Sequence, residues 1–260
     1  MTLPPRTGSS GSSRHTTSSR RAEAALVLFA KAPIAGQVKT RLCPPLTPDE
    51  AASLHGSFVL DSLERSKAAI QQQKLSLDRI LACAPSAAHA FFKILGERHG
   101  VRLIDQVGDD LGARMDQAAS TLFAEGYRRL LIVGTDLPSL PLSTYRDALA
   151  QLDRHPVVLG PALDGGYYLL GLTQPAPELF DRIPWSTAEA LKATLARAEA
   201  AGLSVGQLQS WRDADTIEDL RFIIQEAKQD ERRPKPQRQF SARTAGALQL
   251  IGQRLQARAQ

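Results

Sequence analysis

Residues 129–138 read Arg-Leu-Leu-Ile-Val-Gly-Thr-Asp-Leu-Pro, an apolar run that ends abruptly in a glycine and an acid. A short run of this kind, rich in branched residues and bounded by turn residues, predicts a fully buried β-strand. The strand is expected to end near Val133, so that Asp136 follows at its carboxyl end. Ligands of an open α/β sheet bind beyond the carboxyl ends of its strands. The stretch therefore predicts both a central strand and the functional edge of the sheet.

Further apolar runs alternate with helical patterns on both sides of this stretch. The expected strands are 25–30, 79–84, 101–106, 129–133, 157–160, 167–172 and 204–208. The expected helices are 48–70, 87–95, 112–125, 142–152, 187–201 and 217–228. Such alternation is typical of β-α-β units on a parallel sheet. The sequence thus predicts one α/β domain with a mostly parallel, mixed sheet flanked by helices.

Three of the expected helices begin with capping signals. Thr47 precedes Pro48, and Glu50 follows three residues after the cap, which is the pattern of a capping box. Ser186 and Glu189 form the same pattern ahead of the helix expected at 187–201. Asp215 or Thr216 is expected to cap the last helix of the domain.

The positive charge of the chain lies at its two ends. The net charge is +5, but residues 1–22 contain four arginines and no acid, and residues 231–260 contain seven basic residues and one acid. Residues 23–230 therefore carry −5. We expect a disordered Ser/Thr-rich extension at 1–22, one α/β domain at 23–230 and a basic tail at 231–260, in which Leu248, Ile251 and Leu255 suit one face of a short helix. This distribution argues against a nucleic-acid surface.

The cysteines and the apolar runs limit the class of protein further. Cys43 and Cys83 lie forty positions apart without a Cys-x-x-Cys spacing, so neither a zinc site nor a disulfide framework is indicated. No apolar run reaches the roughly 18 residues that a membrane span needs. We expect a cytoplasmic protein.

The loop after the first expected strand has the composition of a phosphate-binding segment. Residues 29–42 read Phe-Ala-Lys-Ala-Pro-Ile-Ala-Gly-Gln-Val-Lys-Thr-Arg-Leu. Lys31, Lys39 and Arg41 can neutralise a diphosphate or triphosphate, and Gly36 lets backbone N–H groups approach phosphate oxygens. The alternative is a solvated loop with scattered cations.

Four acids are candidates for metal binding or proton transfer. Asp136 is placed to ligate Mg²⁺ or Mn²⁺, or else it satisfies backbone groups in a turn. Asp164 can act as a base or orient a sugar hydroxyl. Gly165, Gly166 and Tyr167 follow it and are candidates for contact with the substrate or acceptor, because paired glycines let the backbone approach a ligand, although an Asp-Gly hairpin turn explains the same pattern. Asp213 and Asp215 can offer carboxylates to the same metal as Asp136.

Residues 106–115 form a weaker candidate, a turn between a strand and a helix. Gln106 can contact a nucleotide base, and Gly108 with its neighbours can present free N–H groups near a helix start. Junctions of this kind usually contain glycine and aspartate in any case.

Several of these segments together resemble a known family. The matching segments are 29–42, 106–115, 134–138, 164–171, 183–187 and 212–220, in the same order along the chain. The family consists of GT-A-fold transferases with an F-A-K-A-P-x-x-G-x-V-K-T-R-L opening. Its members are generally labelled glycosyltransferases of the nucleotide-diphospho-sugar transferase superfamily, and some are linked to arsenosugar biosynthesis. The chain is more distantly similar to 2-phospholactate guanylyltransferase.

The resemblance implies a single GT-A-like, Rossmann-like domain and a role for individual residues. Lys31, Lys39 and Arg41 would hold nucleotide phosphates, Asp136 would ligate a divalent cation, and Asp215 would be the second acid of the metal site. Most GT-A glycosyltransferases carry Asp-x-Asp at the metal position. Pro138 replaces the second acid of that pattern here, so a distant acid is needed.

We expect an enzyme that moves a sugar from a nucleoside-diphosphate sugar to a small acceptor with help from Mg²⁺ or Mn²⁺. Asp164 is the candidate base, and Trp185 either stacks on a sugar ring or belongs to the core. A nucleotidyltransferase that releases pyrophosphate from a nucleoside triphosphate is the first alternative. A non-catalytic protein that binds nucleotides or partners is the second.

Overall fold

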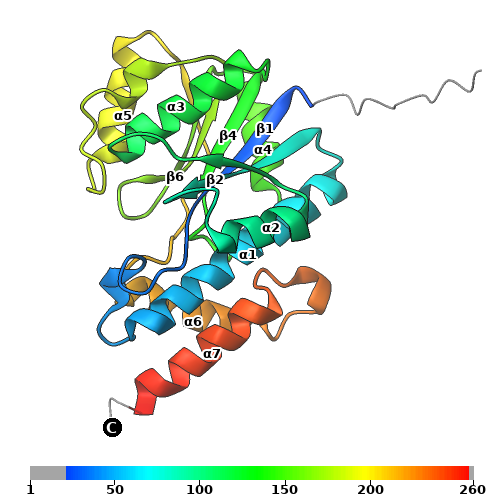
Figure 1. Cartoon of the computed structure of the whole chain (residues 1–260), viewed down its shortest axis with the longest axis vertical. Coiled ribbons are helices and arrows are strands. Elements are labelled where there is room, and N and C mark those ends of the chain that lie inside the picture. Colours follow the sequence, from blue (N-terminus) through cyan, green and yellow to red (C-terminus); the bar gives the residue numbers. More distant parts are fainter. Residues whose placement is uncertain (1–21, 258–260) are drawn as a thin grey trace, which may run out of the picture.

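The computed structural model describes residues 22–257. All but the last residue of the extension expected at 1–22 therefore lies outside the described residues. Figure 1 shows a sheet with helices on both faces and the last helix below it. None of the described helices is long and apolar enough to cross a membrane.

The sheet has seven strands in the order β3-β2-β1-β4-β6-β5-β7. The strands are β1 (Ala24–Lys31), β2 (Leu77–Ala84), β3 (Arg102–Asp105), β4 (Arg129–Gly134), β5 (Val157–Pro161), β6 (Tyr167–Leu172) and β7 (Val205–Gln207). Among the strands of residues 22–257, only β6 runs antiparallel to its neighbours, β4 and β5. The predicted mixed, mostly parallel α/β sheet is confirmed.

The helices cover both faces of this sheet. They are α1 (Pro48–Gln73), α2 (Ala90–His99), α3 (Leu111–Ala124), α4 (Thr144–Leu152), α5 (Ala190–Ala200), α6 (Ile217–Asp230) and α7 (Ala242–Ala257). Short 3₁₀ helices lie at η1 (Thr40–Leu42), η2 (Pro177–Phe180) and η3 (Lys235–Gln237).

Alternate residues of β1 enter two different cores. Leu26 and Leu28 pack with residues of α1, α2 and α4 on one face. Ala25 and Val27 pack with residues of α3 and α5 on the other. Since side chains alternate along a strand, burial on both faces explains why β1 is apolar throughout.

The strand order reverses between β1 and β4. The chain leaves β1 toward β2 on one side of it and later returns to form β4 on the other side. The connecting segments diverge at the carboxyl ends of these two strands, where an α/β sheet forms its ligand crevice.

Two of the predicted helix caps are present and one is wrong. Thr47 and Glu50 form the capping box of α1, and Thr216 forms one with Asp219 at the start of α6. The expected box at Ser186 is absent, because α5 begins only at Ala190 and its N-cap, Glu189, makes no side-chain bond. Ser186 instead has a φ of 63°, which belongs to a turn.

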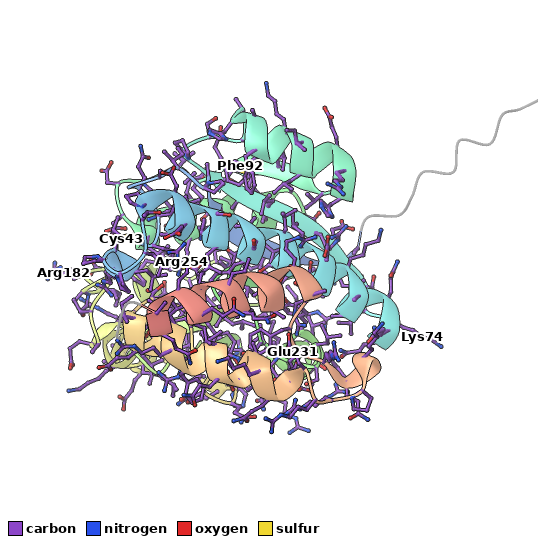
Figure 2. All side chains as sticks on the ribbon, turned by 90° about the horizontal axis from the view of Figure 1, so that it is seen from below. Cys43, Lys74, Phe92, Arg182, Glu231 and Arg254 are labelled. Atoms are coloured by element: carbon purple, nitrogen blue, oxygen red, sulfur yellow. The ribbon has the colours of Figure 1, made fainter. Side chains whose placement is uncertain are left out.

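A third apolar cluster joins α6 and α7 to the first half of α1. Leu248 and Ile251 of α7 pack with Leu220 and Ile224 of α6. Figure 2 shows α7 running alongside α6, with α1 on its other side. This helix lies within the segment expected as a basic tail, and it packs onto the domain.

Candidate active site

A cleft of about 540 Å³ opens at the carboxyl ends of β1 and β4. Its walls include the loop after β1, the end of β4, and segments from α1, from the loop after β3 and from the region before α6. The predicted site residues on these walls are Lys31, Lys39, Arg41, Gln106, Asp136, Asp164 and Asp215. Residues predicted from five separate segments therefore meet in one cleft.

The loop after β1 brings its three cations to the cleft in different environments. Lys31 and Arg41 are exposed to solvent. The side chain of Lys39 is only 4% exposed. Gly36 does not belong to the cleft wall in this structure. Its φ of +78° and the open space around it indicate a role in the turn itself.

Lys39 bridges two carboxylates at the inner end of the cleft. Its ammonium Nζ lies 2.9 Å from Asp136 Oδ2 and 2.6 Å from Asp215 Oδ1. Burial by itself would lower the pKa of Lys39, but the two carboxylates outweigh it and the pKa is raised. The backbone of Lys39 has a φ of 50°, in the left-handed region that residues with a Cβ seldom adopt. The predicted phosphate-binding lysine is thus held inward by acids.

Asp136 is fixed on both sides of its carboxylate. His55 of α1 places Nδ1 at 3.2 Å from Asp136 Oδ1, and its Nε2 lies 3.0 Å from the backbone oxygen of Lys31. Burial would raise the pKa of Asp136, yet Lys39 and His55 outweigh it and hold the pKa well below its usual range. Asp136 was predicted as a metal ligand with Asp215. In this structure the ammonium of Lys39 stands between these two acids.

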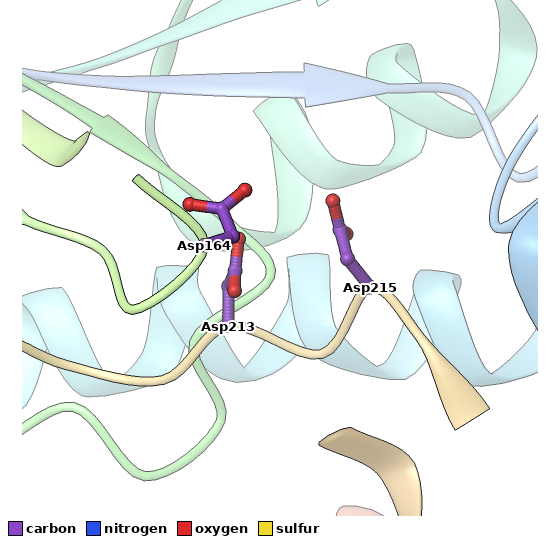
Figure 3. A group of neighbouring side chains, drawn as sticks. All are labelled: Asp164, Asp213 and Asp215. Atoms are coloured by element: carbon purple, nitrogen blue, oxygen red, sulfur yellow. The ribbon is translucent and has the colours of Figure 1, made fainter. Parts of the chain in front are cut away.

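A second group of acids lies beside Lys39. One carboxylate oxygen each from Asp164, Asp213 and Asp215 lies within 4.8 Å of the others. Figure 3 shows Asp213 and Asp215 rising from one stretch ahead of α6, while Asp164 reaches them from the turn between β5 and β6. Asp136 does not belong to this group.

Backbone bonds connect the segments that carry these acids. Leu163 donates its N–H to the backbone oxygen of Trp211 over 3.1 Å, next to Asp164 and Asp213. Ala214 donates its N–H to the backbone oxygen of Asp136 over 3.0 Å. The acids therefore occupy positions set by the fold, and not only by their own side chains.

The acid group has the chemistry of a site for a hard cation. Burial, together with the charges of Asp215 and Asp164, raises the pKa of Asp213 to about 7. Carboxylates this close repel one another, and a divalent cation with oxygen ligands relieves the repulsion. The residues present thus fit Mg²⁺ or Mn²⁺.

An apolar chamber of about 230 Å³ adjoins the cleft. Its walls include Phe29, Leu111, Met115, Ile132, Tyr167 and Trp185. The rings of Tyr167 and Trp185 meet edge to face with their centroids 6.1 Å apart. Asp164 and Asp215 lie on the walls of both the cleft and the chamber. The acid group therefore marks the junction of a polar and an apolar compartment.

Gln106 and Gly108 have structural contacts that the sequence pattern did not indicate. Gln106 donates through Nε2 to the backbone oxygens of Ala30, at 3.1 Å, and Ala82, at 2.8 Å, and so ties β1 to β2. A Cβ at Gly108 would lie 2.8 Å from the backbone of Ala113. Gly108 permits this close approach to α3 and is not on the cleft wall.

The two glycines after Asp164 differ in their surroundings. Gly165 has a φ of +90°, and a Cβ there would lie 2.2 Å from the backbone oxygen of Ala188. Gly166 lines the chamber and donates its N–H to Asp164 Oδ1 over 2.8 Å. The hairpin turn and the functional interpretation of Asp164 are thus compatible.

His55 is the residue of this site that the sequence did not single out. It is 4% exposed and lies on the buried side of a long amphipathic helix. A histidine among apolar helix positions carries no local signal of the acid that it contacts, which is 81 residues away.

Comparison with known proteins gives one family and several structures. Residues 68–187 match the family described as "Uncharacterized protein conserved in bacteria (DUF2064)". None of the curated proteins matches the chain. A solved structure of a "putative nucleotide-diphospho-sugar transferase" from Desulfovibrio desulfuricans G20 is 30% identical, with a TM-score of 0.76, and the match covers 89% of this chain and 96% of that one.

A more remote likeness extends over most of the chain. CMP:2-keto-3-deoxy-manno-octonic acid synthetase, solved with CTP, is 12% identical with a TM-score of 0.51, and the match covers 80% of this chain and 99% of that one. At this identity the likeness shows the shared fold.

Proposed function

This chain belongs to the family of the Desulfovibrio desulfuricans protein, and we propose on that premise that it transfers a sugar from a nucleoside-diphosphate sugar to a small acceptor with help from a divalent cation. One observation carries the proposal. Three carboxylates lie where a cleft with exposed cations meets an apolar chamber whose walls include the rings of Tyr167 and Trp185. A nucleoside-diphosphate sugar has the matching parts, a charged diphosphate next to a ring.

The cleft side suits the diphosphate. Lys31 and Arg41 are exposed there, and both can pair with phosphate oxygens. Asp213 and Asp215 would hold Mg²⁺ or Mn²⁺, and the positive charge of such an ion would offset the negative charge of a leaving nucleoside diphosphate. Asp136 takes part through Lys39, in place of the direct metal contact predicted from the sequence.

The chamber side suits the sugar and the acceptor. Trp185 and Tyr167 offer ring surfaces, and sugar rings pack their apolar faces on such surfaces. Asp164 lies on the walls of both compartments, and Gly166 binds only its Oδ1. We assign Asp164 as the base that accepts the proton of the acceptor hydroxyl.

Nucleotidyl transfer is the second candidate, and Pro138 is the observation that favours it. The acids of the site come from remote segments, because Pro138 occupies the place of a second acid beside Asp136. In this alternative the same cleft holds a nucleoside triphosphate, and a phosphorylated substrate attacks its α-phosphate.

The released product separates the two reactions. The protein is first screened by thermal unfolding with UDP-, GDP- and dTDP-sugars and with the matching triphosphates, each with Mg²⁺ or Mn²⁺, since a ligand of the folded state raises the midpoint. Compounds that bind are then incubated with the protein and small acceptors. We expect release of a nucleoside diphosphate, whereas pyrophosphate release would establish the nucleotidyltransferase.

Two variants serve as references in this screen. Asp215→Asn should abolish the metal-dependent part of the shift, while Glu97→Gln, on the exposed surface of α2, should leave it unchanged. If neither nucleotides nor nucleotide sugars raise the unfolding midpoint of the wild-type protein, the proposed enzyme function is wrong. The alternative of a partner-binding protein then remains.

A further inference from the structure

Lys39 contacts the carboxylate that the proposed cation needs. Its Nζ lies 2.6 Å from Asp215 Oδ1, and Asp215 is also one of the three acids within 4.8 Å of one another. The same ammonium lies 2.9 Å from Asp136 Oδ2. A single side chain therefore connects the candidate metal site with the strand-end acid.

We propose that Lys39 is a built-in competitor of the divalent cation: it occupies Asp215 while the site is empty of substrate, and it moves to the substrate phosphates when the cation takes that carboxylate. This inference rests on the proposed cation-dependent function. It gives Lys39 two successive partners in place of the single phosphate contact that the sequence suggests.

Electrostatics makes the two cations exclude one another at Asp215. Mg²⁺ or Mn²⁺ binds a carboxylate oxygen at about 2.0–2.6 Å, so an ion on Asp215 would stand next to the ammonium of Lys39. Like charges at that distance repel one another. Lys39 is 4% exposed, so solvent screens this repulsion only weakly.

The contacts of Lys39 allow it to leave Asp215 without losing every partner. Asp136 remains at 2.9 Å, and His55 and the backbone N–H of Ala214 hold Asp136 in place. Lysine is a point charge on a flexible stem, so a rotation about its bonds redirects the ammonium. Lys39 already lies on the wall of the cleft that contains Lys31 and Arg41, where the diphosphate is proposed to bind.

This exchange couples the binding of the cation to that of the nucleotide. Phosphates in the cleft attract Lys39 away from Asp215 and thereby remove the competitor of the cation. The apparent affinity for a ligand equals the intrinsic affinity multiplied by the fraction of protein in the binding-competent state. The cation should therefore bind weakly alone and more tightly with nucleotide, and by linkage the reverse also holds.

Direct measurement of Mn²⁺ binding tests the competition without any enzyme assay. Mn²⁺ is titrated by electron paramagnetic resonance or calorimetry into the wild-type protein, Lys39→Met and Lys31→Met. The last variant removes a cation from the same cleft that no carboxylate pairs with in the described contacts, so it measures the general effect of charge. We expect about a tenfold gain in Mn²⁺ affinity for Lys39→Met and less than about a twofold gain for Lys31→Met.

A second arm uses UDP and GDP as probes of the coupling. Either diphosphate should raise the Mn²⁺ affinity of the wild-type protein, and should raise that of Lys39→Met much less, because this variant has no competitor to remove. An Mn²⁺ affinity of Lys39→Met that is equal to or lower than that of the wild-type protein would overturn the proposal and leave Lys39 as a structural cross-link.

Two further variants keep the outcome clear. Lys39→Met takes the ammonium away from Asp136 and Asp215, so Lys39→Met/Asp136→Asn, which removes both charges of one pair, is measured beside it. Circular dichroism checks that both fold, and both should show the gain in affinity. Asp215→Asn should lose Mn²⁺ binding. If the wild-type protein and all variants bind no Mn²⁺ with or without nucleotide, the cation-dependent function itself fails together with this inference.

Discussion

Gly112 provides the space that the indole of Trp185 fills. A Cβ on Gly112 would lie 2.6 Å from the indole Nε1, which is closer than real Cβ contacts. Gly112 belongs to the first turn of α3, and Trp185 comes from the segment before α5. This contact sets the position of one wall of the apolar chamber, beside the acids.

Gly112→Ala should therefore displace Trp185 and reshape the chamber. Alanine favours a helix by about 1 kcal/mol over glycine, but the overlap should outweigh this, with a net loss of about 1–2 kcal/mol of unfolding free energy. Urea unfolding and tryptophan fluorescence measure both effects. Gly246→Ala in α7 is the control, because no atom within 4 Å meets its Cβ, and it should stabilise the protein. Equal responses of the two variants would contradict this account of Trp185.

The start of α6 should matter for the acid next to it. Thr216→Ala removes the cap that follows Asp215 and should cost about 1 kcal/mol of stability. It should also weaken Mn²⁺ binding several-fold. Thr47→Ala removes the equivalent capping box of α1, far along the chain from these acids, and should cost a similar stability without changing Mn²⁺ binding. Calorimetric titration of both variants decides whether the cap positions Asp215.

Asp61 should be a main anchor of α7. It is 1% exposed, accepts hydrogen bonds from Ser241 Oγ at 2.6 Å and Thr244 Oγ1 at 2.5 Å, and pairs with Arg243 at 2.7 Å. Asp61→Ala removes the buried acceptor of Ser241 Oγ and Thr244 Oγ1 and one of the two acidic partners of Arg243, and it should cost about 3 kcal/mol.

Glu64 is a matched control for Asp61. It pairs with the same Arg243, at 3.0 Å, but is 46% exposed, so Glu64→Gln should cost less than about 1 kcal/mol in urea unfolding. Similar losses for the two variants would show that Asp61 does not anchor the helix.

The stability of the metal-free protein should depend on pH through Asp213. The pKa of this carboxyl is about 7 in the folded protein and about 3.8 in the unfolded chain, so the folded state binds the proton more tightly. The contribution is fully present below pH 4 and is lost as the pH rises through 7.

Asp213→Asn removes this dependence. At pH 8 in EDTA, the thermal unfolding midpoint of the variant should lie a few degrees above that of the wild-type protein. This difference should shrink toward pH 5. A difference that does not change between these pH values would mean that Asp213 has an ordinary pKa.

Much of the fold follows from local sequence patterns. The run at 129–133 is apolar because β4 is buried on both faces, and Thr47 and Thr216 cap helices because the partner acid stands three residues later in each case. Ser186 and Glu189 have the same spacing, but they form no capping box. The backbone of Ser186 is held in a turn ahead of α5, and the local sequence does not indicate that constraint.

The sequence predicts which residues belong to the site better than it predicts the contacts between them. Loops after β1 and β4 had to meet, because parallel strands present their carboxyl ends at one edge. The inward path of Lys39 depends on Asp215, 176 residues away, and the approach of Asp164 to Asp213 depends on how two distant turns pack. Such contacts arise from tertiary packing, so the carboxylate partners of Lys39 and the place of His55 in the site could not be predicted from their neighbours in sequence.

The most direct test of the central claim is to locate Mn²⁺ by its anomalous scattering in crystals grown with Mn²⁺ and UDP. The account predicts an ion at about 2.0–2.6 Å from carboxylate oxygens of Asp213 and Asp215, in contact with the diphosphate, with Lys39 withdrawn from Asp215. Diphosphate bound outside the cleft, or an ion at another position with Lys39 still on Asp215, would contradict it.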